Sequence, residues 1–447
     1  MLAIGLFFEG PVSLSAQQSP IRLYTIPSQS ASQTLAQAVS PHEDPRKPWI
    51  RSRRGVTLTT SALERLGPGG IEEPTELSLD LPSLGTVTAA VRPNPRRGRR
   101  GSEPHAWSGR LKSHSDSEVT LVAHGHVMAG SIRKGQALFE IRPGSGETHD
   151  LIEIDANALP SDHHPIPVSR EELTAAEAAV EPSGQNTAPS TAADNGSVID
   201  VMVVYTTAAK NANGGQNGIE ALIDLGISLA NTAFNNSQIN TQFQLVHAAE
   251  VSYTESGNYN TDLSRLRSTN DGFMDEVHGW RNTYKADLVA LIEDNLGGAC
   301  GVAYVMTNVS SGFAGWAFSV TQDSCISGYT LAHELGHNMG SQHDRLEGGT
   351  GAYPYSFGHK EGGKFRTIMA YPCSTNCIRI NHFSNPNVRY QGNWVTGIDH
   401  NSDPANSADN ARAFSNALST IANFRDSGGP VDSTPPPPPA NLRIVDP

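Results

Sequence analysis

The stretch HELGHNMGSQHD at residues 333–344 constrains the fold of this chain more than any other feature. In a helix, His333 and His337 are four residues apart, so they lie on the same face, one turn from each other. Gly340 can adopt a positive φ angle and end the helix sharply. The chain can then turn back and bring His343 to the same point. The sequence thus predicts a helix, a sharp turn and a returning segment around three converging imidazole rings.

Three imidazole nitrogens that converge on one point suit a zinc ion, and histidines that recur by chance in a helix are the alternative. Structural zinc sites usually fill all four positions with protein ligands, whereas catalytic sites leave one position for water. Glu334 lies about 100° around the helix axis from His333, which places its carboxylate near that open position. We therefore predict one catalytic Zn²⁺ bound by His333, His337 and His343, with Glu334 as general base for a zinc-activated water.

Around this stretch, apolar strands alternate with helices whose apolar residues recur at helical spacing. The predicted strands are 199–206, 243–254, 287–294, 301–306 and 317–322, and the predicted helices are 218–234, 272–284, 329–340 and 408–426. This order indicates an α/β fold with a central mixed sheet.

The preceding part of the chain has a different pattern, in which short alternating or apolar runs are separated by Gly, Pro and Asp turns. This pattern predicts a β-rich domain from about residue 17 to 168. Its predicted strands are 76–81, 86–91, 118–124, 127–132 and 137–143. Residues 169–197 are rich in Ala, Ser, Thr, Glu and Pro, so we interpret them as a linker with a short helix at its start.

The two ends of the chain carry further signals. Residues 1–16 contain a short apolar stretch followed by small residues, which we interpret as a truncated signal peptide, the alternative being simply an apolar end. Five consecutive prolines within residues 428–447 predict a stiff spacer before the start of a further module. The domain assignment is therefore 1–16 signal, 17–168 β-rich domain, 169–197 linker, 198–427 α/β domain and 428–447 Pro-rich tail.

Composition and cysteine usage narrow the class of protein. The net charge of −13 argues against a nucleic-acid partner, and no apolar run is long enough to predict a membrane span. Four cysteines, all after residue 299, predict two disulfides in an exported protein. Of the three pairings, we favour Cys300–Cys325 with Cys373–Cys377. We expect a protein that is secreted, or periplasmic in transit, and a monomer, although the sequence leaves the oligomeric state open.

The pattern HExxHxxGxxH resembles the zinc signature of the metzincin metalloendopeptidases, and Asp344 after the third histidine resembles the adamalysin, or reprolysin, branch. TIMAYP at 367–372 is similar to the Met-turn of that family, with Met369 beneath the metal, although Met369 alone could be an ordinary core methionine. The resemblance covers about 199–426 and is to the secreted bacterial type, which includes peptidyl-Asp metalloendopeptidases. It implies a metzincin domain with a twisted mixed sheet, long helices, an active-site helix and a Met-turn, preceded by a β-rich propeptide.

The resemblance also implies roles for individual residues. Tyr371, which animal adamalysins lack, would stabilise the oxyanion, as in the astacin and serralysin branches. Asp200 and Asp287 would bind a structural Ca²⁺, unless they are simply strand-end caps. GVAYVM at 301–306 would pair with an extended peptide substrate, unless it is an ordinary covered strand. Arg379 would select an acidic side chain after the scissile bond, unless it is a solvated surface arginine.

The β-rich domain has no cysteine, so a cysteine that blocks the zinc is excluded. SDHHP at 161–165 offers Asp162, His163 and His164 as replacement ligands, unless it is a polar loop. The linker is a suitable place for maturation cleavage, which would give a mature chain that starts near Val198.

These observations predict a secreted zinc endopeptidase that hydrolyses protein substrates and is made as a zymogen. The alternative is a catalytically inactive metzincin that serves as a protein-binding or adhesion module. Inactive members usually lose the glutamate or a histidine, and this chain retains Glu334 and all three histidines. A zinc hydrolase acting on another kind of substrate is a third interpretation, against which the edge strand and the Met-turn argue.

Overall fold

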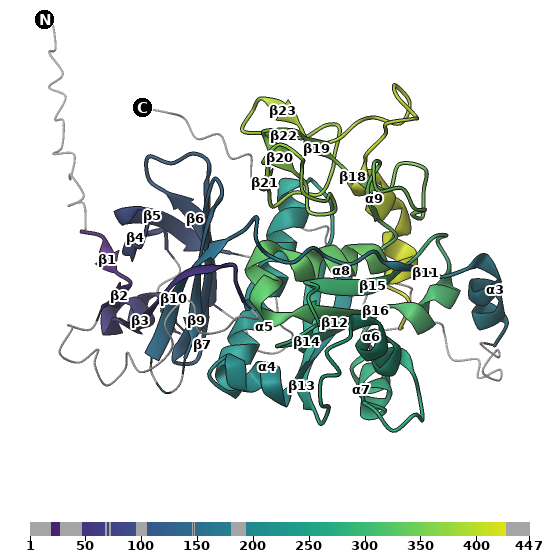
Figure 1. Cartoon of the computed structure of the whole chain (residues 1–447), viewed down its shortest axis with the longest axis horizontal. Helices are drawn as coiled ribbons and strands as arrows, with labels where there is room; N and C mark the ends of the chain where they lie inside the picture. Colours follow the sequence, from purple (N-terminus) through teal and green to yellow (C-terminus); the bar gives the residue numbers. More distant parts are fainter. Residues whose placement is uncertain are drawn as a thin grey trace, which may run out of the picture.

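The computed structural model describes residues 19–26, 47–67, 69–70, 73–94, 105–144, 146, 148–179 and 194–425. The interpretations of residues 1–16 as a signal peptide and of 428–447 as a Pro-rich tail lie outside these residues. The described chain forms two domains side by side, which we call the front domain (described residues from 19 to 155) and the second domain (residues 194–425) (Figure 1).

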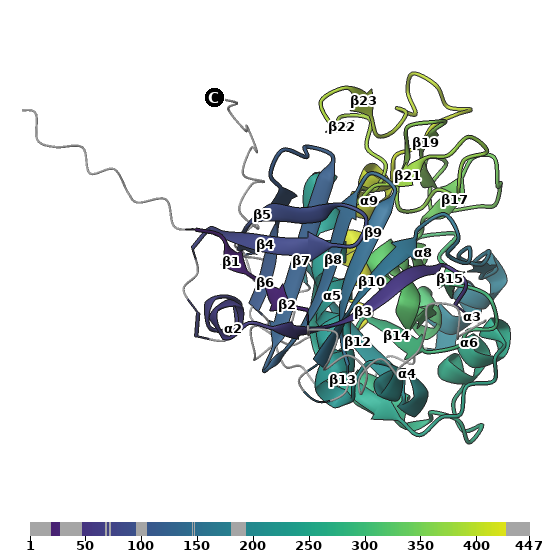
Figure 2. The same cartoon turned by 60° about the vertical axis from the view of Figure 1, so that its left-hand side comes forward.

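The front domain is built on one ten-stranded sheet, in the order β1-β4-β5-β6-β7-β8-β9-β10-β3-β2. From β4 to β10 each strand pairs antiparallel with the next (Figure 2). The elements are β1 (Ile21–Arg22), β2 (Tyr24–Thr25), β3 (Ile50–Leu58), α2 (Thr60–Leu66), β4 (Thr75–Leu81), β5 (Gly85–Pro93), β6 (His105–Leu111), β7 (Ser117–His124), β8 (Val127–Lys134), β9 (Ala137–Pro143) and β10 (Thr148–Asp155). The β-rich character of this region is confirmed.

The second domain has a six-stranded mixed sheet in the order β11-β15-β16-β14-β12-β13. The strands are β11 (Ile166–Pro167), β12 (Val198–Thr206), β13 (Gln242–Val251), β14 (Leu288–Glu293), β15 (Gly301–Val305) and β16 (Phe318–Gln322). Strand β14 runs parallel to β12 and β16, whereas β15 runs antiparallel to β16. The fully buried residues of β14 explain its continuous apolar sequence. The α/β character of this domain is confirmed.

Helices and smaller sheets surround this sheet. The helices are α3 (Arg170–Ala179), α4 (Thr207–Ala212), α5 (Gln216–Asn236), α6 (Tyr259–Arg267), α7 (Glu276–Tyr284), η1 (Ser311–Trp316), η2 (Asp323–Gly328), α8 (Thr330–Asn338) and α9 (Asn410–Ile421). The short strands are β17 (Gln342–Asp344), β18 (Phe357–Gly358), β19 (Lys360–Glu361), β20 (Phe365–Arg366), β21 (Ile378–Arg379), β22 (Arg389–Tyr390) and β23 (Trp394–Val395). None of the helices in the described ranges has both the length and the apolar character needed to cross a membrane.

Helix α5 joins the two domains. It packs against β13 and α8 of its own domain and against β7 and β8 of the front domain. Ala106, Val122 and Ala129 of the front domain belong to the same apolar core as α5. A helix covered on opposite sides has to be apolar around most of its circumference, which accounts for the Ile, Leu, Ala and Gly content of α5. A few side chains of the front domain thus contribute to the core of the second domain.

After β10, residues 156–168 cross from the front domain to the far side of the second domain (Figure 1), and we call them the crossing segment. The segment follows the free edge of β15. The Cys300 amide donates to the Ser161 carbonyl (3.1 Å), and the His163 amide donates to the Gly301 carbonyl (2.8 Å). Strand β11 then pairs parallel with Tyr304 and Val305. The edge that the sequence predicted for an extended substrate is therefore covered by the chain itself.

Candidate metal centre and adjoining pocket

Helix α8 carries His333 and His337 on one face, and the chain then turns at Gly340, whose φ angle is +96°. A Cβ atom at this position would lie 2.6 Å from the Cβ of Ala352, so the tight turn requires glycine. The turn brings His343, on β17, back to the helix. The Nε2 atoms of the three rings lie 3.0–3.1 Å from one another. In the described chain, they form the one group of His, Cys, Asp or Glu residues that could hold a metal ion.

The surroundings of the rings prepare them for a cation. The Nδ1 atom of His333 lies 2.8 Å from the Ile368 carbonyl, and that of His337 lies 2.7 Å from the Ser341 carbonyl. An N–H that donates to these carbonyls leaves Nε2 unprotonated. Burial lowers the pKa of His333 to about 4, and the pKa values of His337 and His343 well below their usual range. Because zinc–nitrogen bonds are about 2.0–2.1 Å long, three such nitrogens can bind one Zn²⁺.

Glu334 lies next to this group on α8 and is fully buried. Neither of its carboxylate oxygens has a hydrogen-bond partner among the described residues. Burial, with a smaller contribution from the charge of Asp162, raises the pKa of Glu334 well above its usual range. A Cβ atom at Gly301 would lie only 2.5 Å from Glu334 Oε1, so the carboxylate sits directly against the start of β15. The carboxylate therefore lies against the sheet edge, on the same helix as His333 and His337.

The segment around Met369 packs against α8 and against the segment that follows His343. The sulfur of Met369 packs against Gly336 of α8, where a Cβ atom would lie 2.7 Å from it. The Asp344 carboxylate accepts a hydrogen bond from the Tyr371 amide (3.1 Å) and pairs with Lys360 (2.8 Å). These contacts tie the segment after His343 to the segment after Met369. The Tyr371 ring consequently lies 3.9 Å from the His343 ring, centroid to centroid.

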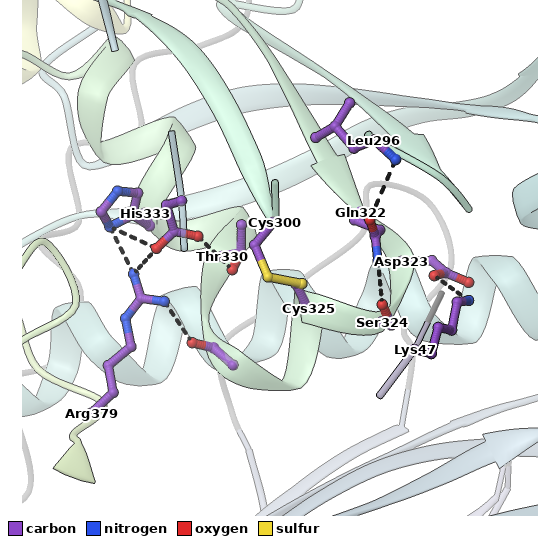
Figure 3. The surroundings of a disulfide bond; sticks show 12 residues. Lys47, Leu296, Cys300, Gln322, Asp323, Ser324, Cys325, Thr330, His333 and Arg379 are labelled. Carbon is purple, nitrogen blue, oxygen red and sulfur yellow. Dashed lines mark hydrogen bonds and ion pairs between the residues drawn. A yellow bond between two sulfur atoms is a disulfide. The ribbon is translucent and has the colours of Figure 1, made fainter. Parts of the chain in front are cut away.

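A charged pocket adjoins the other edge of the His333 ring. Arg379 is buried, so the interpretation of this residue as a solvated surface arginine is wrong. Its guanidinium donates to the carbonyls of Gly328 (3.1 Å) and Ile368 (2.6 Å), and Nη2 lies 2.7 Å from His333 Nδ1. Figure 3 shows Arg379 directed at His333, with Thr330 between that histidine and the Cys300–Cys325 disulfide.

The pocket contains a carboxylate from the crossing segment. The Asp162 carboxylate pairs with Arg379 Nη2 (2.7 Å), accepts a hydrogen bond from the Thr330 hydroxyl (2.9 Å) and lies 3.7 Å from His333 Nδ1. Burial raises the pKa of this carboxyl, but Arg379, His333 and Arg366 together outweigh burial and hold the pKa well below its usual range. Asp162 is therefore a buried, ionised group, and SDHHP is not simply a polar loop.

Other predicted residues lie near the centre without joining it. The His164 ring is 5.4 Å from both His343 and Tyr371, centroid to centroid, and the His163 ring packs on Tyr259 at 4.0 Å. Neither His163 nor His164 belongs to the group that could hold a metal.

The predicted calcium ligands serve another purpose. The Asp287 carboxylate accepts hydrogen bonds from the amides of Asp200 (2.9 Å) and Arg425 (3.1 Å). Buried Arg281 donates to the Asp287 carbonyl. The acceptors of Asp287 are thus used by protein donors, as in a strand-end cap, and the described residues give no support for calcium at Asp200 and Asp287.

The structure forms the disulfides Cys300–Cys325 and Cys373–Cys377, the pairing that the sequence analysis favoured. The first fixes the start of β15 to the turn before α8. The second closes a short loop ahead of Arg379. Both lie beside the pocket, together with Arg366, whose guanidinium donates to the Ala370 carbonyl (2.6 Å). The sequence analysis did not identify Thr330 or Arg366 as pocket residues, because no local motif links them to Arg379.

Three neutral imidazoles beside a buried carboxylate, at the edge of a sheet, define the site of a metallopeptidase. A family model described as Reprolysin_5, metallo-peptidase family M12, matches residues 195–384. The chain belongs to this reprolysin-like family and is a metalloendopeptidase.

Named relatives support the assignment over most of the chain. A peptidyl-Asp metalloendopeptidase of Stenotrophomonas maltophilia (strain R551-3) is 37% identical over 343 residues, which are 71% of this chain and 76% of the relative. One of Xanthomonas campestris pv. campestris is 35% identical over 311 residues, 69% of this chain and 70% of the relative. Among solved structures, metalloproteinase-II from Bacteroides fragilis is 13% identical with a TM-score of 0.38, covering 72% of this chain and 88% of that chain. So distant a likeness carries no argument.

Proposed function

We propose that this protein is a secreted zinc endopeptidase, made as a zymogen, that cuts peptide bonds before an acidic residue. The observation that carries the proposal is the position of Glu334, which is buried without a hydrogen-bond partner among the described residues and follows His333, one of three convergent, neutral histidines. His333, His337 and His343 would hold the ion. A bound zinc supplies Lewis-acid chemistry, which polarises a carbonyl and makes water more acidic.

The chain's own residues perform the remaining steps. Glu334 accepts a proton from the attacking water and then passes it to the leaving amine. Tyr371 donates a hydrogen bond to an oxygen of the scissile carbonyl. Support for that role comes from its contact in the structure, where the Tyr371 hydroxyl donates to the main-chain carbonyl of Asp162 (2.6 Å). Met369 packs beneath α8 and keeps the histidines in place.

The pocket next to His333 supports the preference for an acidic residue. Arg379 is buried there and already pairs with a carboxylate. Relatives of this chain carry the name peptidyl-Asp metalloendopeptidase. We infer that Arg379 binds the acidic side chain of the residue that follows the scissile bond, while β15 binds the extended main chain.

The zymogen part of the proposal rests on the crossing segment, which lies along β15 and would have to leave before a substrate strand could pair there. Between residues 163 and 199, Asp194 is the only aspartate of the sequence. An enzyme that prefers aspartate to glutamate after the cut, as the name of its peptidyl-Asp relatives indicates, would cut the linker before Asp194 and leave the four linker glutamates. Asn423 binds the amide of Asp194 (3.0 Å) and its carbonyl (2.8 Å), and so would anchor the new terminus. N-terminal sequencing of mature enzyme should begin at Asp194; a start before residue 169 in fully active enzyme would contradict maturation in the linker.

The experiment that tests the proposed function measures zinc content and casein hydrolysis in the protein after cleavage of its linker. We expect about one zinc per chain, hydrolysis that stops with a chelator, and recovery when zinc is returned. A protein that binds zinc but does not cut casein would favour the alternative, an inactive binding module. The two disulfides support an extracellular location.

A further inference from the structure

We infer that Asp162 occupies the pocket that selects the acidic residue of a substrate, so that the front domain blocks the enzyme by filling this specificity pocket. The inference rests on the proposed function, and it deepens that proposal by naming Thr330 as a second residue that recognises the acidic side chain. In this arrangement Asp162 acts through the pocket, next to the metal ligands and not as one of them.

The contacts of the Asp162 side chain carry this assignment. It is 5% exposed, although aspartate is rarely buried without partners. Arg379 Nη2 and the Thr330 hydroxyl bind its two oxygens at 2.7 and 2.9 Å. The carboxylate approaches His333 at Nδ1, on the opposite edge of the ring from the Nε2 atom that faces the other histidines. The Asp162 carboxylate therefore lies in a side-chain pocket next to the metal centre.

The main chain of the crossing segment is held on both sides of this residue. The Ser161 carbonyl and the His163 amide bond to Cys300 and Gly301, at the start of β15. The Asp162 carbonyl accepts the Tyr371 hydroxyl at 2.6 Å. An extended strand with one side chain buried in a pocket is the way in which sheet edges bind peptides. The crossing segment thus occupies the sheet edge and the pocket at the same time.

The charges of the pocket explain why its occupant is acidic. The guanidinium of Arg379 is buried, and that of Arg366 lies close by and is partly buried. Buried cations are costly unless an anion pairs with them. The short aspartate side chain lets Arg379 and Thr330 each bind one oxygen. The same donors would bind the carboxylate of a substrate once Asp162 has left, and an uncharged side chain would leave Arg379 unpaired.

The test uses the full chain with a protease site inserted between residues 180 and 193. Cutting this site leaves the front fragment held only by non-covalent contacts, and its dissociation constant is measured on the zinc-loaded protein. We expect Asp162→Asn to raise this constant about 30-fold, because the variant removes one partner of a buried charge pair. Asp162→Glu, which keeps the charge, should recover part of the loss. The uncut Asp162→Asn chain should also show higher peptidase activity than the uncut wild type.

A matched control and a second variant keep the result specific. Asp150 on β10 is another front-domain aspartate paired with an arginine, Arg53, but both of these side chains are partly exposed. Asp150→Asn should change the dissociation constant less than about twofold, as expected for an exposed pair. In an Arg379→Gln background, Asp162→Asn should have little further effect, because its partner is already gone.

The outcomes separate this inference from the proposed function. A cut protein that hydrolyses peptides but binds the Asp162→Asn front fragment as tightly as the wild-type fragment overturns the inference alone. An equal effect of Asp162→Asn in the wild-type and in the Arg379→Gln background also overturns it. A protein that shows the expected loss of affinity but cuts no peptide supports Asp162 as the pocket ligand and refutes the proposed endopeptidase.

Discussion

The two edges of the His333 ring face opposite kinds of chemistry. On the Nε2 edge, the structure gathers acceptors, namely three imidazole nitrogens and the Glu334 carboxylate. On the Nδ1 edge, the ring donates to the Ile368 carbonyl, and beside it Arg379 and Thr330 donate to the Asp162 carboxylate. Acceptors that are buried close together require a cation, whereas a buried guanidinium requires an anion. One ring therefore separates a metal centre from a carboxylate pocket.

This difference predicts two separable sets of effects. Changes on the Nε2 edge should alter the rate of bond cleavage for every substrate. Changes on the Nδ1 edge should alter which substrates are cut and how firmly the front domain stays bound. A variant that affected both edges equally would show that the ring does not divide the site.

The largest effect is expected for Glu334→Gln, which removes the proposed base without changing the shape of the side chain. The value of kcat should fall by about 10³-fold, since positioned acid–base groups contribute between 10² and 10⁴. Zinc content, measured by atomic emission, should stay at about one per chain because the three histidines are intact. Glu276→Gln on α7 is the matched control and should change neither quantity. Near-normal turnover in Glu334→Gln would rule out this base.

The next effect concerns Tyr371, which lies beside His343. Burial raises the pKa of its hydroxyl, so the group remains a hydrogen-bond donor at all working pH values. Tyr371→Phe should lower kcat by about 100-fold with little change in KM, as does the loss of one oxyanion donor in other enzymes. Steady-state kinetics of the wild type and of Tyr371→Phe, measured on the same peptide, test this expectation. A change confined to KM would instead make Tyr371 a residue that only binds substrate.

A smaller effect, confined to selectivity, is expected for Arg379→Gln. The ratio of kcat/KM for two peptides that differ only by Asp or Asn after the cut should fall by about 30-fold, because the buried charge pair is lost. Activity on the Asn peptide should change little. Arg389→Gln, at an exposed arginine of β22, provides the control. An unchanged ratio in Arg379→Gln would place the specificity determinant elsewhere.

The same comparison shows how much could be predicted from the sequence. The histidine group comes from eleven consecutive residues, and helical geometry with one glycine turn is enough to bring His333, His337 and His343 together. The pocket instead joins Asp162 to Arg379, which is 217 residues away. Only the complete fold determines that pairing, so the sequence left Asp162 and Arg379 each with two interpretations.

The fold shows the same dependence on distance along the chain. Apolar periodicity located the main strands and helices of the second domain, because each pattern is contained in its own segment. In the front domain, β3 was missed: its sequence IRSRRGVTL has three arginines among nine residues, and the strand is held by pairing with β10, about a hundred residues later. The apolar core shared through α5 was also unforeseen, since its partners β7 and β8 precede it by about a hundred residues.

The smallest predicted effect concerns the interface between the two domains, away from both edges of the His333 ring. It tests whether pH changes the affinity of the front domain for the second domain. Glu118 on β7 accepts hydrogen bonds from Asn381 (2.8 Å) and from Tyr329 (3.0 Å). Burial raises the pKa of Glu118, and these two hydrogen bonds, together with nearby Arg133 and Arg110, only partly oppose the shift. A pKa that is higher in the docked state means that docking favours the protonated form. This contribution is therefore fully present below the ordinary glutamate pKa and is lost as pH rises through the raised value.

We expect the dissociation constant of the cut front fragment to increase a few-fold as the pH rises from 5 to about 7.5. Glu118→Gln should reduce this slope. Part of the pH dependence should remain in this variant, because burial also raises the pKa of Glu140 at the same interface. The low pKa of Asp162 acts in the opposite direction but only below the ordinary aspartate value, outside this window. Tighter binding at higher pH, or an unchanged slope in Glu118→Gln, would show that Glu118 does not control release of the front domain.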